Sequence, residues 1–174
     1  MKKILCFTLI IVMALSLGAC MPQSGNVTKT QKVTDPATTD EIAAVNYSDS
    51  IRGVCEYMAD LGYVYALPES TGDEMKDPHI MDAELIGADE GYKFTCDYEG
   101  SNINVEIYSF SNTDGAYYKQ GREEGKVTIS KDIENGTFEV TFSGNGKYMM
   151  VYDDSADRAE RKAAAVKAFE AFYA

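Results

Sequence analysis

The chain contains one histidine, His79, and no tryptophan. A Ser-His-Asp site would have to use His79, which follows Pro78 in a polar stretch typical of a loop. No His-Glu-x-x-His, Gly-x-Ser-x-Gly or Cys-x-x-Cys motif occurs. The sequence therefore lacks the patterns of zinc protease, serine hydrolase and dithiol chemistry. We expect no enzymatic activity, no metal site and no cofactor.

Basic residues are scarce, because 16 Lys and Arg stand against 28 Asp and Glu, for a formal net charge of −12. Phosphate backbones repel such a chain, so nucleic acid is excluded as a partner. Adjacent acids such as Asp89-Glu90 and Glu123-Glu124 fall in predicted turns or helix starts, where water leaves a carboxylate unperturbed. The acidic residues therefore indicate a solvated surface.

A single long apolar run occurs, from Ile4 to Leu17, directly after Lys2 and Lys3. It is shorter than the roughly 20 apolar residues of a membrane-spanning helix, and its cationic start is typical of a signal peptide. The next residues, Leu17-Gly18-Ala19-Cys20, resemble the lipobox of bacterial lipoproteins. This resemblance implies cleavage before Cys20 and lipid attachment to its thiol. An ordinary secreted protein cut near Ala19 is the alternative.

Lipidation at Cys20 implies a protein anchored in the cell membrane, on its extracytoplasmic face. Two or more acyl chains (palmitate among them) on one residue anchor a protein stably. Lys2 and Lys3 leave with the leader, so the formal net charge changes from −12 to −14. We predict a signal peptide over 1–19, a lipidated cysteine with a disordered, Thr-rich tether over 20–46, and one globular domain over 47–174.

The globular part begins and ends with helical patterns. Apolar residues from Ile51 to Leu61 recur at the helical period after Ser48 or Asp49, and Gly62 ends the pattern. The C-terminal helix begins near Asp153–Asp157, and its predicted apolar side is Ala159, Lys162, Val166, Phe169 and Tyr173, with Ala163 and Phe172 beside it. Both helices are expected to cover one face of a sheet.

Strict alternation between 92 and 98 and between 103 and 107 predicts strands with one dry and one wet face. Further candidate strands are 84–88, 127–129, 138–142 and 147–152, with Asn135-Gly136 and Asn145-Gly146 as hairpin turns. Met149 and Met150 suggest one central strand that is apolar on both faces. Residues 114–125 form either a short helix or an ordered loop. The predicted fold is α+β: an antiparallel sheet of five or six strands with the N-terminal and C-terminal helices on one face.

Cys55 and Cys96 remain after the leader is removed and Cys20 is lipidated. Each lies on a predicted apolar face, so the two either form a disulfide or stay as buried thiols.

We expect a binding or protein-interaction module, with an envelope protein or a glycan as its partner. The element order resembles small lipoproteins of Gram-positive bacteria, a resemblance that assigns no functional residue. The predicted contact face is the wet side of the sheet: Lys93, Asp97, Asn104, Glu106, Tyr108 and Glu139. Tyr108 and Phe110 either form an exposed aromatic platform, or they cover a sheet edge or meet the Tyr117-Tyr118 segment. The alternatives are a small-molecule carrier, with a cavity lined by Tyr57, Tyr92 and Phe142, and a carboxylate-dependent envelope hydrolase.

Overall fold

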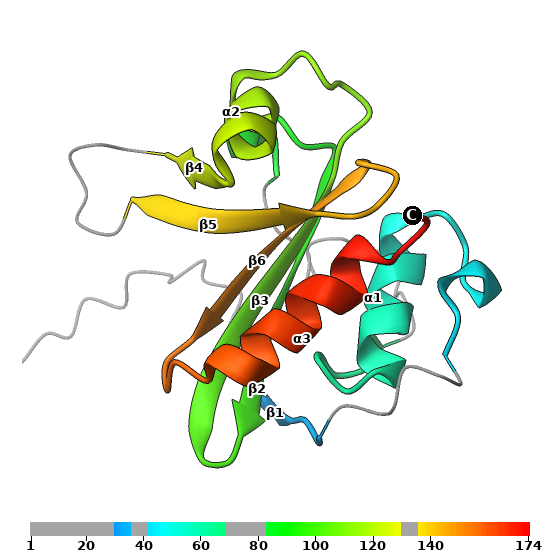
Figure 1. Ribbon diagram of the computed structural model, residues 1–174, viewed down its shortest axis with the longest axis vertical. Helices are drawn as coiled ribbons and strands as arrows, with labels where there is room; N and C mark the ends of the chain where they lie inside the picture. The colour runs from blue at the N-terminus through cyan, green and yellow to red at the C-terminus, as the bar shows by residue number, and fades with distance from the viewer. Residues whose placement is uncertain (1–29, 36–41, 69–82, 130–135) are drawn as a thin grey trace, which may run out of the picture.

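A computed structural model describes residues 30–35, 42–68, 83–129 and 136–174. Six strands are present: β1 (Gln31–Lys32), β2 (Glu90–Tyr98), β3 (Ser101–Ser109), β4 (Lys126–Thr128), β5 (Thr137–Phe142) and β6 (Tyr148–Asp154). The helices are α1 (Ile51–Asp60), α2 (Ala116–Glu124) and α3 (Ala159–Glu170), with short 3-10 helices η1 (Ala44–Asn46) and η3 (Glu84–Ile86). Figure 1 shows α3 crossing the sheet diagonally with α1 beside it. The expected α+β class is confirmed.

The sheet is mixed, which corrects the expectation of a purely antiparallel one. The strand order is β1-β2-β3-β6-β5-β4, and every pair is antiparallel except β1 with β2. In that parallel pair Gln31 lies opposite Cys96 and Lys32 opposite Asp97. The extra strand comes from a segment that sequence composition assigned to a disordered tether.

The segment before α1 therefore differs from the predicted tether in its described part. Val33 N donates to Asp97 O at 3.0 Å, and the Tyr98 hydroxyl donates to the Asp35 carboxylate. Arg161 of α3 donates to the Thr34 carbonyl at 3.3 Å. Cys20, with the leader and the first tether residues, lies outside the described residues. Low hydrophobicity failed as a guide here because backbone pairing with a sheet edge needs no apolar side chains.

The β2–β3 hairpin closes through two residues, Glu99 (φ 51°) and Gly100 (φ 79°). Positive φ at both positions is the requirement of a type I′ turn, whose twist matches the strands. The predicted Asn145-Gly146 turn is real, but of another type. Gly146 alone has positive φ (73°), and its N–H donates to Ser143 O at 2.8 Å, as in a type I turn followed by a left-handed glycine.

Helix α1 begins after Ser50, whose hydroxyl accepts the Gly53 N–H at 3.0 Å. The cap is thus one or two residues later than predicted, whereas Gly62 (φ 81°) ends the helix region as expected. Helices α1 and α3 and the sheet together bury the larger hydrophobic cluster, called here the helix-side cluster. Its fully buried members include Val54, Met58, Leu61, Phe94, Ile103, Val105, Ile107, Met150, Phe169 and Phe172.

The buried side of α3 differs from the predicted one. Arg161, Ala165, Ala168 and Phe169 are buried, whereas Ala159 is exposed. Arg161 is 7% exposed and lies over the Tyr98 ring at 3.9 Å and the Tyr63 ring at 5.5 Å. The sequence could not define the apolar face of α3 because alanines occur on several sides of the helix. The buried Arg161 also places a charged residue on the side that faces the core.

The other side of the sheet, called here the second face, is covered in part. The second-face cluster contains Ala83, Ile86, Ala88, Tyr108, Phe110, Val127, Val140, Phe142 and Met149. It lies under η3 and α2, the latter above β4 and β5 in Figure 1. Because this face carries a core of its own, the predicted wet face is corrected to a partly dry one.

One glycine, Gly121, and one methionine, Met149, explain how the second face is built. Gly121 lets α2 lie close to β5, since a Cβ there would be 3.1 Å from both Val140 and Phe142. Met149 belongs to the second-face cluster and Met150 to the helix-side cluster. Strand β6 is therefore apolar on both faces, as the sequence predicted, and it lies inside the sheet.

The predicted strand over 84–88 is not formed. The 3-10 helix η3 (Glu84–Ile86) takes its place and ends at Gly87 (φ 71°).

Within the described ranges, no helix is both long enough and apolar enough to cross a membrane.

Candidate functional site

Five of the six predicted contact residues lie on the second face of the β2–β3 hairpin. Lys93 lies opposite Glu106, and Asp97 lies opposite Asn102 in the same register. The carboxylate of Asp97 accepts the Gly100 N–H at 3.2 Å, so it serves the turn. Asn104 accepts a hydrogen bond from its cross-strand neighbour Thr95 at 3.2 Å.

Glu139 lies on the opposite side of the sheet, which corrects its predicted place on the contact face. Its neighbour Val140 is the one that joins the second-face cluster. Lys162 of α3 donates to Glu139 Oε2 at 2.6 Å, and this hydrogen bond lowers the pKa of the Glu139 carboxyl. Alternation showed that neighbours in β5 face opposite ways, but not which set faced the helices.

Tyr108 and Phe110 do not form an exposed platform. The Tyr108 ring lies against Gly91, because a Cβ on Gly91 would be 2.8 Å from it. Phe110 meets the Tyr118 ring edge to face at 5.3 Å, and both Tyr108 and Phe110 are buried. Phe110 therefore meets the Tyr117-Tyr118 segment as in the alternative prediction, whereas Tyr108 packs against Gly91 instead.

An apolar groove remains open on the second face between η3 and the β4–β5 pair. Its volume is about 330 Å³. The apolar lining consists of Leu85, Ile86, Val127, Ile129, Phe138, Val140, Met149 and Val151. Three of these are exposed despite their size: Leu85 by 68%, Ile129 by 37% and Phe138 by 37%. Apolar surface gathered around a concavity is typical of a binding site.

The polar groups of this groove form one network. Lys93 Nζ donates to Glu106 Oε1 at 2.9 Å, and the Tyr108 hydroxyl donates to Glu106 Oε2 at 2.8 Å. Burial, and then the neighbouring Glu106, raises the pKa of Tyr108 far above its usual value. The phenol therefore stays protonated as a donor, and the lysine and glutamate neutralise each other.

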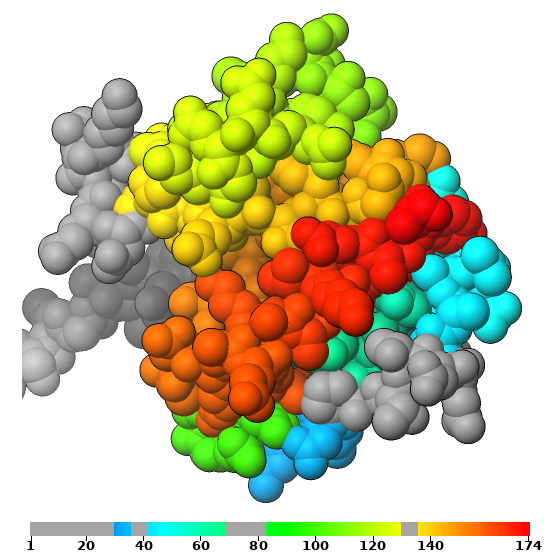
Figure 2. All heavy atoms as spheres, in the orientation of Figure 1, coloured from blue at the N-terminus to red at the C-terminus, as the bar shows by residue number. Residues whose placement is uncertain are grey.

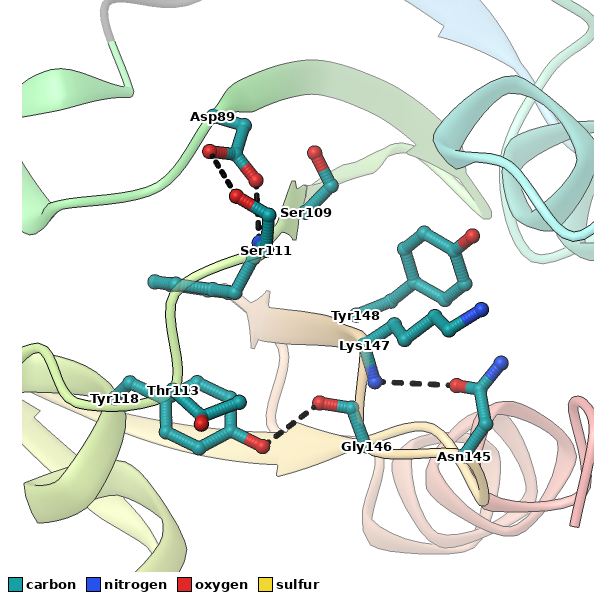
Figure 3. Close-up of a pocket in the computed structure, with 10 residues that line it drawn as sticks. Asp89, Ser109, Ser111, Thr113, Tyr118, Asn145, Gly146, Lys147 and Tyr148 are labelled. Atoms are coloured by element: carbon teal, nitrogen blue, oxygen red, sulfur yellow. Dashed lines mark hydrogen bonds between the residues drawn. The ribbon is translucent and has the colours of Figure 1, made fainter.

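A second concavity lies at the end of β3 and β6 beside α2, with a volume of about 430 Å³ (Figure 3). Asp89 accepts hydrogen bonds from both the amide and the hydroxyl of Ser111 on one wall. On the other wall the Tyr118 hydroxyl donates to Gly146 O at 3.0 Å. This cleft has more polar lining residues than the groove, and several of them already have hydrogen-bond partners: Asp89, Ser111, Tyr118, Asn145, Lys147 and Tyr148.

The side chains of Asn145, Lys147 and Tyr148 point to the same side of the cleft in Figure 3. All three donate to the Asp49 carboxylate, from the amide at 3.0 Å, from the ammonium, and from the phenol at 2.9 Å. The hydrogen bond from Lys147 lowers the pKa of Asp49. These contacts join the β5–β6 turn to the start of α1, so the charged groups of this region stabilise the packing of the turn against the helix.

A shallow pocket of about 470 Å³ between β5, β6 and α3 contains two carboxylates, Glu139 and Asp153. Both side chains are exposed, and Glu139 is paired with Lys162. In Figure 2 the β5 atoms (yellow) stay visible between α2 and α3 on this side of the molecule. Glycosidase-type acids need one carboxyl shielded from water, and neither of these is.

Cys55 and Cys96 are free thiols, both fully buried in the helix-side cluster. Burial raises the pKa of the Cys96 thiol to about 12 and that of Cys55 further above its usual value. Of the two sequence alternatives, the structure has the pair of buried thiols.

The predicted carrier cavity between helices and sheet is not formed by its three expected residues. Tyr57 belongs to the helix-side cluster and Phe142 to the second-face cluster, with the sheet between them. Tyr92 packs against the helix side only. The groove on the second face is an apolar concavity of a size suited to a small ligand, and sequence reasoning missed its lining. The one available signal is the alternation of Phe138, Val140 and Phe142, which puts them on one face of β5 without showing which face.

His79 lies outside the described residues. In the ranges that the structure covers, no three His, Cys, Asp or Glu side chains come together as a possible metal site. Comparisons of the chain with protein-family models, with characterised proteins and with solved structures give no match.

Proposed function

We propose that the chain is a lipid-anchored extracytoplasmic binding module whose ligand site is the groove on the second face of the sheet. The cationic start, the apolar run and the Leu17-Gly18-Ala19-Cys20 motif support anchoring through Cys20. The excess of acidic residues suits a soluble head held near, but not against, an anionic membrane.

The observation that carries the binding proposal is the exposure of Leu85, Ile129 and Phe138 around one concavity. Large apolar side chains scattered singly need no explanation, but three around a groove mark a surface that is covered in use. Catalysis is not part of the proposal, since the three described pockets hold no shielded pair of carboxylates.

A small-molecule carrier is the second candidate. It is favoured by the groove volume of about 330 Å³, which lies within the range of small-ligand sites. The hydrogen-bonded Tyr108 and Glu106 at its floor provide the few polar groups that orient a ligand in such sites.

The anchor is tested by mass spectrometry of the N-terminal peptide from membranes. The intact protein is expected to carry a diacylglyceryl group on Cys20. Cys20→Ala is expected to lose it, whereas Cys6→Ala, a change inside the leader, is expected to retain it. An unmodified Cys20 in membrane-bound protein would refute the anchor.

The site is tested by placing a photoreactive phenylalanine analogue at position 138 in living cells, with position 45 as the matched control. Val45 is also an exposed apolar residue (75%) but is not part of the groove. We expect an adduct at position 138 and none at position 45, and the adduct mass distinguishes a protein partner from a small molecule. Equal labelling, or none, would remove the groove as the site.

A further inference from the structure

We infer that the groove on the second face takes an uncharged, apolar small molecule with one hydrogen-bonding group directed at Tyr108 and Glu106. This inference rests on the proposed use of the groove for binding, and it does not depend on where the protein is located. It names the chemical class of the ligand from the charge and shape of the lining.

The groove provides contact area mainly through carbon atoms. Met149 and Val151 of β6 form part of its floor, and Leu85 and Phe138 stand on opposite sides of it. The flexible side chains of Leu85 and Met149 can adapt to a ligand by changing rotamer. A ligand here would remove the exposed Phe138 and Leu85 surface from water, which is the main favourable contribution to binding at such a site.

The paired charges of Lys93 and Glu106 exclude ions as ligands. Lys93 and Glu106 are the charged residues of the described lining, and they form a partly buried pair at 2.9 Å, so together they contribute no net charge. A ligand that covers this pair also excludes water from it. An anion would have to draw Lys93 away from Glu106, and a cation would have to compete with Lys93 for the carboxylate. An uncharged ligand leaves the pair intact and avoids an unpaired charge in a low-dielectric site.

The hydrogen-bonding preference follows from the same network. The Glu106 carboxylate accepts from Lys93 and Tyr108, which leaves carboxylate lone pairs for a third donor. A hydroxyl or amine N–H on the ligand would fit that position. The predicted class is therefore an apolar ring or chain with one neutral donor.

The test compares two fluorescent probes that share one aromatic framework, uncharged N-phenylnaphthylamine and anionic anilinonaphthalenesulfonate. The protein is residues 21–174, which contain every described helix and strand and both hydrophobic clusters. We expect saturable binding of the uncharged probe at one site per chain, with the sulfonate at least about tenfold weaker.

Matched variants locate the probe. Phe138→Ser is expected to weaken the uncharged probe by about tenfold, because it removes one apolar wall. Val45→Ser removes a still more exposed apolar side chain elsewhere and is expected to change the affinity by less than about twofold. Since both residues are exposed, circular dichroism should show that neither variant has lost its fold.

Glu106→Gln tests the charge argument itself. It replaces the one carboxylate among the described lining residues with a neutral amide, so the lining gains positive charge and the sulfonate should gain affinity while the uncharged probe changes little. Sulfonate binding tighter than that of the uncharged probe in the unaltered chain would refute the ligand class. Two results would overturn the inference: no saturable binding of the uncharged probe to the unaltered chain, or binding of this probe to Phe138→Ser with unchanged affinity. A protein-sized adduct at position 138 together with such a failure would leave the binding module intact and reject only the small-molecule ligand.

Discussion

Arg161→Ala tests how one buried cation holds three parts of the chain together. The guanidinium donates to the Gly62 carbonyl at 2.7 Å and to the Thr34 carbonyl at 3.3 Å, and it lies over the Tyr98 ring. These contacts connect α3 to the end of α1, to the segment after β1, and to β2. Its contacts with the described residues are backbone carbonyls and aromatic rings, which therefore provide its stabilisation.

The expected cost is about 3 kcal/mol of unfolding free energy. A hydrogen bond from a charged group contributes roughly 1.5–3 kcal/mol, and a buried cation–ring contact adds about 1–2 kcal/mol. The substitution also removes the free-energy cost of burying the guanidinium charge, which offsets part of this loss. For a chain of this size a loss of about 3 kcal/mol lowers the Tm by roughly 6–12 °C.

The measurement is thermal and urea unfolding followed by circular dichroism, with Arg52→Ala as control. Arg52 also lies on a helix and pairs with Glu56 at 3.1 Å, but both side chains are solvent-exposed, so its loss should cost less than about 1 kcal/mol. Hydrogen exchange should accelerate at Val33 in Arg161→Ala alone. If the two arginine variants melt together, or Val33 stays protected, Arg161 does not hold β1 in place.

Three further changes have defined outcomes. Lys147 lowers the folded-state pKa of Asp49, so this carboxylate stabilises the fold above its unfolded pKa of about 4 and the contribution is lost as the pH falls through the lower folded value. Asp49→Asn should therefore weaken the decline of the urea midpoint at acidic pH, and an unchanged acid profile would contradict the argument. Gly53→Ala should lower the Tm although alanine favours helices, because its Cβ would lie 2.0 Å from a backbone oxygen. Gly115→Ala, with its nearest neighbour at 4.0 Å, should leave the Tm nearly unchanged, and equal effects would refute the steric reason. The buried Cys96 thiol, whose pKa is raised to about 12, should react with maleimide only in denaturant, and fast labelling of native protein would show that it is accessible.

The β2–β3 hairpin and the central β6 strand were predictable because their residue patterns are compatible with one type of secondary structure and one pattern of burial. Strict alternation from 92 to 98 and from 103 to 107 fixes which side chains share a face, and Met149 with Met150 requires burial on both faces. Helix α1 was equally clear, since its apolar residues recur at the helical period and Gly62 ends it.

The second face could not be predicted, because local periodicity does not define the order in which layers stack. Glu139 was assigned to the wrong side since alternation gives no register between separate strands. Residues 84–88 looked like a short strand but form a 3-10 turn that closes one side of the groove. Arg161 was overlooked because a cation whose partners are backbone carbonyls and rings has no signature in sequence.

The parallel strand β1 determines how this head would respond to tension on the chain ahead of Thr30. Only two residues of β1 pair with β2, and Val33, Thr34 and Asp35 add a few further contacts. Pulling would detach this segment, including Val33 at the margin of the helix-side cluster, before it unfolds the rest of the domain, and each freed residue would add at most about 3.5 Å of extended chain. The distance between the folded domain and the pulled end of the chain would thereby increase while the domain keeps its fold.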